Sequence, residues 1–114
     1  MSSEFTDDAT FRRAVGDTLR ALLDQVDDLD SEDHDPQLSE GNLKTVFESG
    51  GTYILSQQTP LHEIWLSAEL QAWHFVSAQG VWVERDTKTS MVQVLSQLFS
   101  TKLQMDIRFE LSPR

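Results

Sequence analysis

Apolar residues recur at helical spacing near the start of the chain. They lie three or four positions apart and would share one face of a helix: Phe11, Val15, Leu19, Leu22, Val26 and Leu29. Thr6, Asp7 and Asp8 stand before this stripe, and side chains of these types accept hydrogen bonds from the free amides of a helix N-terminus. The pattern therefore predicts an amphipathic helix over residues 7–29.

Short runs of strand-like composition follow this helix. Residues 30–41 are polar and include Pro36 and Gly41, so they predict a loop with at most a short strand near 37–39. The strand-like runs cover residues 42–48, 52–57, 63–68, 73–77 and 81–86. Because the connections between these runs are short, they predict an antiparallel meander.

A second helical stripe follows the strands and consists of Met91, Val94, Leu95, Leu98 and Phe99. It predicts a helix that starts between residues 87 and 90 and ends near 102–103. The residues that follow, about 104–114, form a C-terminal tail. Alternate positions of this tail are apolar, which indicates that the tail lies along the domain.

The order helix, strands, helix determines the expected fold class, because two amphipathic helices can cover one face of an antiparallel sheet. We expect an α+β fold, a two-layer sandwich with two helices packed on one face of a five- to six-stranded antiparallel sheet. At 114 residues, the chain is expected to form a single domain over residues 1–114.

Charge and composition exclude several function classes. Nine basic and 19 acidic residues give a net charge of −10, which disfavours nucleic acids and anionic membranes as partners. The absence of cysteine rules out disulfides and thiolate chemistry. No apolar run approaches the roughly 20 residues of a membrane span. The first residues lack the features of a leader peptide. We expect a cytoplasmic protein.

The excess acids gather in the first half of the chain. Residues 24–35 contain seven acids and no base. On a helical wheel, Asp17, Asp24 and Asp28 fall within about 40° of one another, opposite the apolar stripe. Such crowding is unfavourable near a helix C-terminus, which carries partial negative charge. Either water alone solvates these acids, or a cation or a basic partner relieves their repulsion.

The donor atoms of this acidic run would select hard cations in general rather than one metal. The run does not fit an EF-hand. Counted from Asp28, the positions that require Gly and Glu hold Asp33 and Ser39. We therefore expect an open surface that binds cations weakly at several sites.

Other motifs are incomplete. His62-Glu63 begins like the zinc-protease motif HExxH, but Leu66 stands where the second His is needed. Trp65 shares a strand face with Glu63 and Ser67, opposite the inferred core face. Trp65 is then either an anchor for a partner on an open sheet face or a side chain that packs against the neighbouring strand.

Two segments resemble a known family. Gln58-Thr59-Pro60, followed by Glu63-Ile64-Trp65-Leu66-Ser67, resembles the Q-x-P…(I/V)-W-L motif of frataxins. Asp27-Asp28-Leu29-Asp30 is similar to the acidic ridge of the bacterial (CyaY) branch, and the resemblance covers roughly residues 5–109. The chain departs from the family at Ser56 and Gln57, where an Asn and then a basic residue are usual.

The resemblance implies the helix–sheet–helix sandwich derived above and a role in iron–sulfur cluster assembly. Family members act there as iron-binding regulators or iron donors rather than as enzymes. They bind Fe²⁺ and Fe³⁺ weakly on the acidic ridge and need no organic cofactor. The implied partners are the cysteine desulfurase and the iron–sulfur scaffold protein, which bind through the acidic ridge and the open sheet face.

The positions that match the acidic ridge, together with Asp33 from the same run, are the candidate metal residues: Asp24, Asp27, Asp28, Asp30, Glu32, Asp33 and Glu48. The candidate partner-binding residues are Asp17, Gln58, Trp65 and Ser67. Two alternatives stay open, an acidic protein-docking module without a metal role and a weak ferroxidase. We expect a monomer, with a metal-induced oligomer as the alternative.

Overall fold

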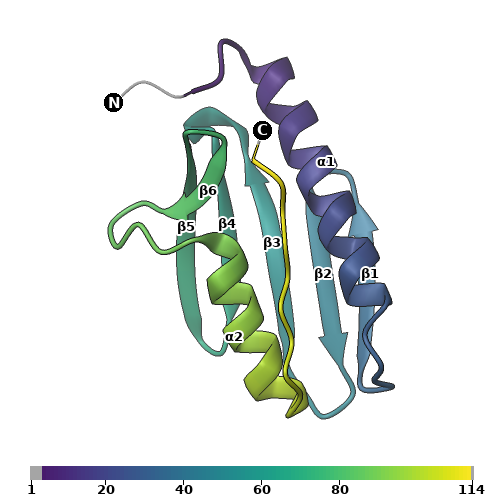
Figure 1. Ribbon diagram of the computed structural model, residues 1–114. Coiled ribbons are helices and arrows are strands. Elements are labelled where there is room, and N and C mark those ends of the chain that lie inside the picture. Colours follow the sequence, from purple (N-terminus) through teal and green to yellow (C-terminus); the bar gives the residue numbers. More distant parts are fainter. Residues whose placement is uncertain (1–3, 114) are drawn as a thin grey trace.

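Residues 4–113 form two layers, with two helices in front of a six-stranded sheet (Figure 1). The structure is a computed structural model, which describes these residues. The elements are α1 (Asp8–Asp27), β1 (His34–Ser39), β2 (Asn42–Phe47), β3 (Thr52–Gln58), a 3₁₀ turn η1 (Thr59–Leu61), β4 (Glu63–Ala68), β5 (Gln71–Ala78), β6 (Val81–Glu84) and α2 (Met91–Leu103). Both helices lie on the same face of the sheet, which confirms the predicted α+β sandwich.

The sheet is the predicted antiparallel meander. Each strand pairs with the next, in the order β1-β2-β3-β4-β5-β6. β1 is a full strand rather than the loop with a short strand that Pro36 and its polar neighbours predicted. Within residues 4–113, β1 lies at the edge of the sheet and pairs only with β2. No strand on its other side therefore needs a hydrogen bond from residue 36, which as a proline has no amide hydrogen.

One helix and one strand, α1 and β6, each end two residues earlier than predicted. Hydrogen bonds explain both differences. α1 ends at Asp27 rather than near residue 29, because the Leu29 amide bonds the Val26 carbonyl in a tighter turn. β6 ends at Glu84 rather than Asp86, because the Glu84 carboxylate accepts the amides of Asp86 and Thr87 and turns the chain.

The core lies between the sheet and the helices. The stripe of α1 is buried from Phe11 to Val26, and Ile64, Leu66 and Ala68 of β4 are buried opposite it, as the alternation predicted. Burial of a large apolar side chain contributes about 1.5–3 kcal/mol. Within the described part of the chain, no helix combines the length and apolarity that crossing a bilayer requires.

Residues 104–113, called the strap below, begin with the turn that ends α2 and then run in an extended conformation between α1 and α2 (Figure 1). Ile107 and Phe109 of the strap are buried, and the Phe109 amide donates to Ser96 Oγ of α2 at 2.8 Å. On the other side, the Gln25 side chain of α1 bonds both the amide and the carbonyl of Glu110, at 2.9 and 2.7 Å. The strap therefore joins the two helices and covers the core between them.

Candidate functional site

The acidic ridge consists of the seven candidate metal residues named above. Asp24 and Asp27 lie on the last turns of α1, Asp28 caps its C-terminus, and Asp30 and Glu32 follow in the loop to β1. These side chains are exposed, and the last turn of α1 contains no basic residue. The end of α1 therefore presents negative side chains beside the negative end of the helix dipole.

Asp33 and Glu48 extend the ridge across the ends of β1 and β2. The Glu48 amide donates to the Asp33 carbonyl at 2.9 Å, and the Ser49 amide donates to Asp33 Oδ1 at 2.7 Å. The hydrogen bonds from Ser49 hold the pKa of the Asp33 carboxyl below its ordinary value. Asp33 thus also anchors the β2–β3 turn, whereas the exposed Glu48 carboxylate stays on the surface.

The ridge is an open surface rather than a pre-formed chelate. Within residues 4–113, no group of three or more His, Asp or Glu side chains converges as a metal ion would require. Carboxylate oxygens in this arrangement suit hydrated hard cations held at the surface. His34, which lies in the same acidic run, directs Nε2 to the Val26 carbonyl at 2.8 Å and so links β1 to α1.

Neutralising part of the ridge should stabilise the protein without metal. In the Asp24→Asn/Asp28→Asn variant we expect the free energy of unfolding to rise by some tenths of a kcal/mol, roughly the size of like-charge repulsion one turn apart. Any rise in melting temperature with Fe²⁺ should disappear, because a ligand stabilises only the state that binds it. Anaerobic thermal melts with and without Fe²⁺ measure both effects. A variant that melts well below wild type would show that the acids are structural.

Acid should destabilise the fold through three carboxyls whose hydrogen bonds to backbone amides lower their pKa: Asp7, Asp33 and Glu84. As the pH falls below about 4, the unfolded chain takes up these protons before the folded protein does. Their contribution to stability is therefore complete above the ordinary carboxyl pKa and is lost as the pH falls through the lower folded values. Urea unfolding between pH 7 and pH 3 measures this loss, and a flat profile would contradict it.

The remaining candidate partner residues separate into two places. Gln58, Trp65 and Ser67 lie on the outward face of the sheet, where Gln58 pairs with Glu63 and Ser56 pairs with Trp65 across strands. Asp17 lies apart from them on α1, 3.8 Å from Arg20, and both of these side chains are exposed. Of the two departures from the frataxin pattern, Ser56 lies on the outward face and Gln57 alternates to the opposite one.

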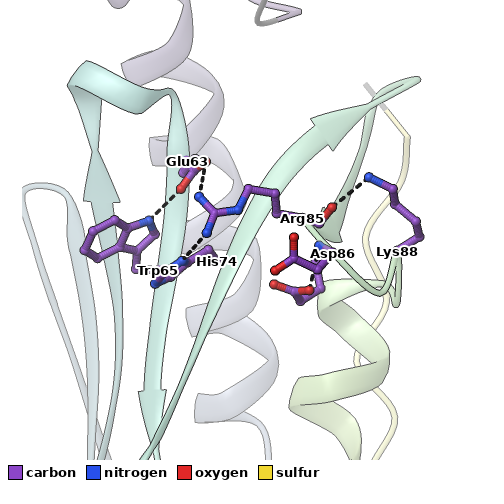
Figure 2. Close-up of polar contacts among 7 residues, drawn as sticks. Glu63, Trp65, His74, Arg85, Asp86 and Lys88 are labelled. Carbon is purple, nitrogen blue, oxygen red and sulfur yellow. Dashed lines mark hydrogen bonds and ion pairs between the residues drawn. The ribbon is translucent and has the colours of Figure 1, made fainter. Parts of the chain in front are cut away.

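Trp65 belongs to a cluster of four side chains on the outward face (Figure 2). Its ring stacks on His74 of β5 with 4.4 Å between centroids, and its Nε1 donates to Glu63 Oε1 at 2.8 Å. Arg85 bridges the cluster, with Nη1 3.4 Å from Glu63 Oε2 and Nη2 3.1 Å from His74 Nδ1. Trp65 therefore packs against the neighbouring strand, and its ring stays half-buried. Its role as an anchor for a partner stays a prediction.

The contact with Arg85 orients the His74 ring. Because a guanidinium can only donate, His74 Nδ1 accepts from Arg85 Nη2. Glu63 is 5% exposed, whereas the strand alternation assigned it to an open face. Sequence reasoning missed His74 and Arg85 as members of this cluster. The alternation of two adjacent strands could have indicated the pairing of Trp65 with His74, but no pattern pointed to Arg85.

Comparison with known proteins places this fold among frataxins. A family model described as a frataxin-like domain matches residues 4–105. The chain is 24% identical to the iron–sulfur cluster assembly protein CyaY of Pseudoalteromonas atlantica, over 90% of this chain and 94% of that one.

Solved structures agree with this match. Frataxin from Psychromonas ingrahamii superposes with a TM-score of 0.85 at 19% identity, over 93% of this chain and 100% of that one. A trimeric frataxin from Saccharomyces cerevisiae, crystallised as a ferrous complex, superposes with a TM-score of 0.70 at 29% identity, over 80% of this chain and 86% of that one.

Proposed function

Because this chain belongs to the frataxin-like family, we propose that it acts in iron–sulfur cluster assembly as an iron-binding regulator or iron donor. In this role it is not an enzyme. It binds the cysteine desulfurase and its scaffold protein, and iron is a cargo that the acidic ridge holds weakly. The outward face around Gln58, Trp65 and Ser67 provides the second contact.

The observation that carries this proposal is the concentration of exposed carboxylates at one end of α1. Asp24, Asp27 and Asp28 are exposed there without a basic residue in the last turn. On a chain of net charge −10, such a surface attracts a basic protein and speeds their association. A cation bound on the ridge reduces the negative charge that the partner meets, so iron and partner binding are coupled through the same side chains.

A binding titration against a purified bacterial cysteine desulfurase tests the proposal. It is run at two salt concentrations, with and without Fe²⁺ and under anaerobic conditions. We expect the affinity to fall with salt, to change with Fe²⁺, and to fall about tenfold or more in the Asp24→Asn/Asp28→Asn variant. The matched control is Asp86→Asn/Asp106→Asn, which removes the same charge from exposed residues outside the ridge.

The control variant separates a local effect from a general charge effect. An equal loss of affinity in both variants would show that only net charge matters and that the ridge is not the interface. No binding under any condition would contradict the desulfurase as partner.

A docking module without a metal role is the second candidate. It is favoured by the absence of a converging ligand group within residues 4–113. It predicts the same dependence on salt and on the ridge, with no response to Fe²⁺. A weak ferroxidase would instead consume oxygen in proportion to added Fe²⁺, faster than iron in buffer.

A further inference from the structure

The β4–β5 hairpin turns on a leucine whose backbone conformation is unfavourable for leucine. Two-residue loops join β1 to β2, β4 to β5 and β5 to β6, and their second residues are Gly41, Leu70 and Gly80. These residues have φ values of 77°, 61° and 79°. Glycine and asparagine adopt this left-handed region readily, whereas a side chain branched like that of leucine is strained there. Leu70 therefore stands where the other two loops use glycine.

The side chain of Leu70 makes no compensating contribution to the core, because it is fully exposed at 108% relative accessibility. Glu69 beside it also has a positive φ, of 50°. A strained turn that presents an apolar side chain to water gains nothing in the isolated chain. Backbone strain that the fold itself does not require points to a contact with another molecule.

A groove of about 650 Å³ lies beside the hairpin tip, between β5 and α2. The tip contributes Glu69 and Gln71, and the apolar lining includes Trp73 of β5 with Val94 and Leu98 of α2. Leu70 is outside this lining, directly next to it in the chain. The volume is in the range of ligand-binding clefts, about 300–1,000 Å³.

The groove is negatively charged at two places. Glu84 lies in its wall, and the hydrogen bonds from Thr87 and Asp86 outweigh the effect of burial and lower the pKa of the Glu84 carboxyl. Glu69 lies beside the Tyr53 hydroxyl, and burial together with this carboxylate raises the pKa of Tyr53 to about 12. Lys102, the one cation among the lining residues that the structure describes, holds its Nζ 5.4 Å from the centroid of the Phe47 ring.

We propose that the hairpin tip and this groove form a docking site for a segment of a partner protein in which an arginine adjoins an apolar residue. The guanidinium enters the groove toward Glu69 and Glu84, over the indole of Trp73, where a cation is favoured by both charge and the aromatic ring. The apolar residue packs on Leu70. A segment of protein fits better than a small cation, because Leu70 extends the surface beyond the groove.

This site is separate from the acidic ridge and from the outward face. The ridge lies on α1 and the ends of β1 and β2, and the outward face carries Gln58, Trp65 and Ser67. The groove lies on the helix side of the sheet, at β5, the β6–α2 loop and α2. Its occupation therefore does not depend on the role proposed for iron.

Amide and indole NMR shifts of the full chain, titrated with the dipeptide N-acetyl-Leu-Arg-amide, test the proposal. We expect saturable shifts at the Trp73 indole and at residues 69–71, and no such shifts with N-acetyl-Leu-Glu-amide. Leu70→Asn places a residue suited to the left-handed region at the tip, so this variant should be as stable as wild type or more stable. Its affinity for the arginine peptide should fall about fivefold, and that of Glu69→Gln should fall similarly.

The control variant is Gln79→Asn, because Gln79 has a φ of 54° in the β5–β6 loop. This variant should bind the peptide as wild type does. Undiminished binding in Leu70→Asn would overturn the proposal, as would shifts confined to the acidic ridge or an equal response to the glutamate peptide. A Leu70→Asn variant less stable than wild type would show that the leucine serves the fold. Self-association that the same variant abolishes would assign the surface to a second copy instead.

Discussion

Replacing Phe109 with alanine should lower the free energy of unfolding by about 3–5 kcal/mol. The ring is 4% exposed and meets Phe99 of α2 edge-on at 5.1 Å between centroids. It closes the core from the strap, where it borders a small void shared with Leu22, Leu43 and Leu95. Alanine would leave a cavity that the strap cannot fill, because hydrogen bonds donated by the Phe109 and Glu110 amides hold its backbone in place.

Urea unfolding at pH 7 measures this loss, with Arg108→Ala as the matched control. Arg108 is exposed on the same strap, so its replacement should change stability by no more than about 0.5 kcal/mol. A domain of this size has roughly 5–15 kcal/mol of stability, so the Phe109 variant should be marginal. If the free energy of unfolding of Phe109→Ala lies within 1 kcal/mol of that of wild type, roughly the uncertainty of the extrapolation, the strap does not close the core.

Replacing Glu84 with leucine should cost about 2–3 kcal/mol, although leucine is the more apolar residue. The Glu84 side chain is 9% exposed, and its Oε1 accepts the amides of Asp86 at 2.8 Å and Thr87 at 2.9 Å. Leucine would remove the acceptor of both amides and loosen the loop that leads to the N-cap residue Ser90 of α2.

Glu84→Gln is the control, because its amide oxygen can accept the same two hydrogen bonds without the charge. We expect it to lose less than half of what leucine loses, and to show a weaker decrease in stability between pH 5 and pH 3. The same urea unfolding series measures both variants. If the leucine variant is as stable as wild type, water accepts the hydrogen bonds of the loop amides in place of Glu84.

Much of the fold follows from local pattern. The spacing from Phe11 to Val26 matches a helix over about four turns, and strand alternation assigns Ile64 and Leu66 to the core correctly. β1 was not predicted as a full strand, because the effect of Pro36 depends on whether its strand is central or at the edge of the sheet. That position in the sheet is decided by pairing partners, which no local window contains.

The candidate site also contains residues that the sequence predicts and contacts that it does not. The acidic run is visible in the sequence because its members are neighbours, and the structure places them on one exposed end of α1. The Glu63–Arg85 pair joins residues 22 positions apart, and the clasp between Gln25 and Glu110 spans 85. Such contacts arise only when the sheet and helices have been assembled, so sequence pattern gave no signal for them.

The strap also sets an order of events during synthesis. Every strand pairs with its neighbour in the chain, so the sheet can form progressively as it emerges, by local and therefore fast steps. The ring that closes the core, Phe109, is made after every helix and strand. At translation rates of about 5–20 residues per second, it follows Leu43 of β2 by roughly 3–13 s. Until the strap packs in place, the apolar side chains between α1 and α2 lack their cover. Protease digestion of released chains that end before and after residue 109 should therefore show protection only in the longer ones.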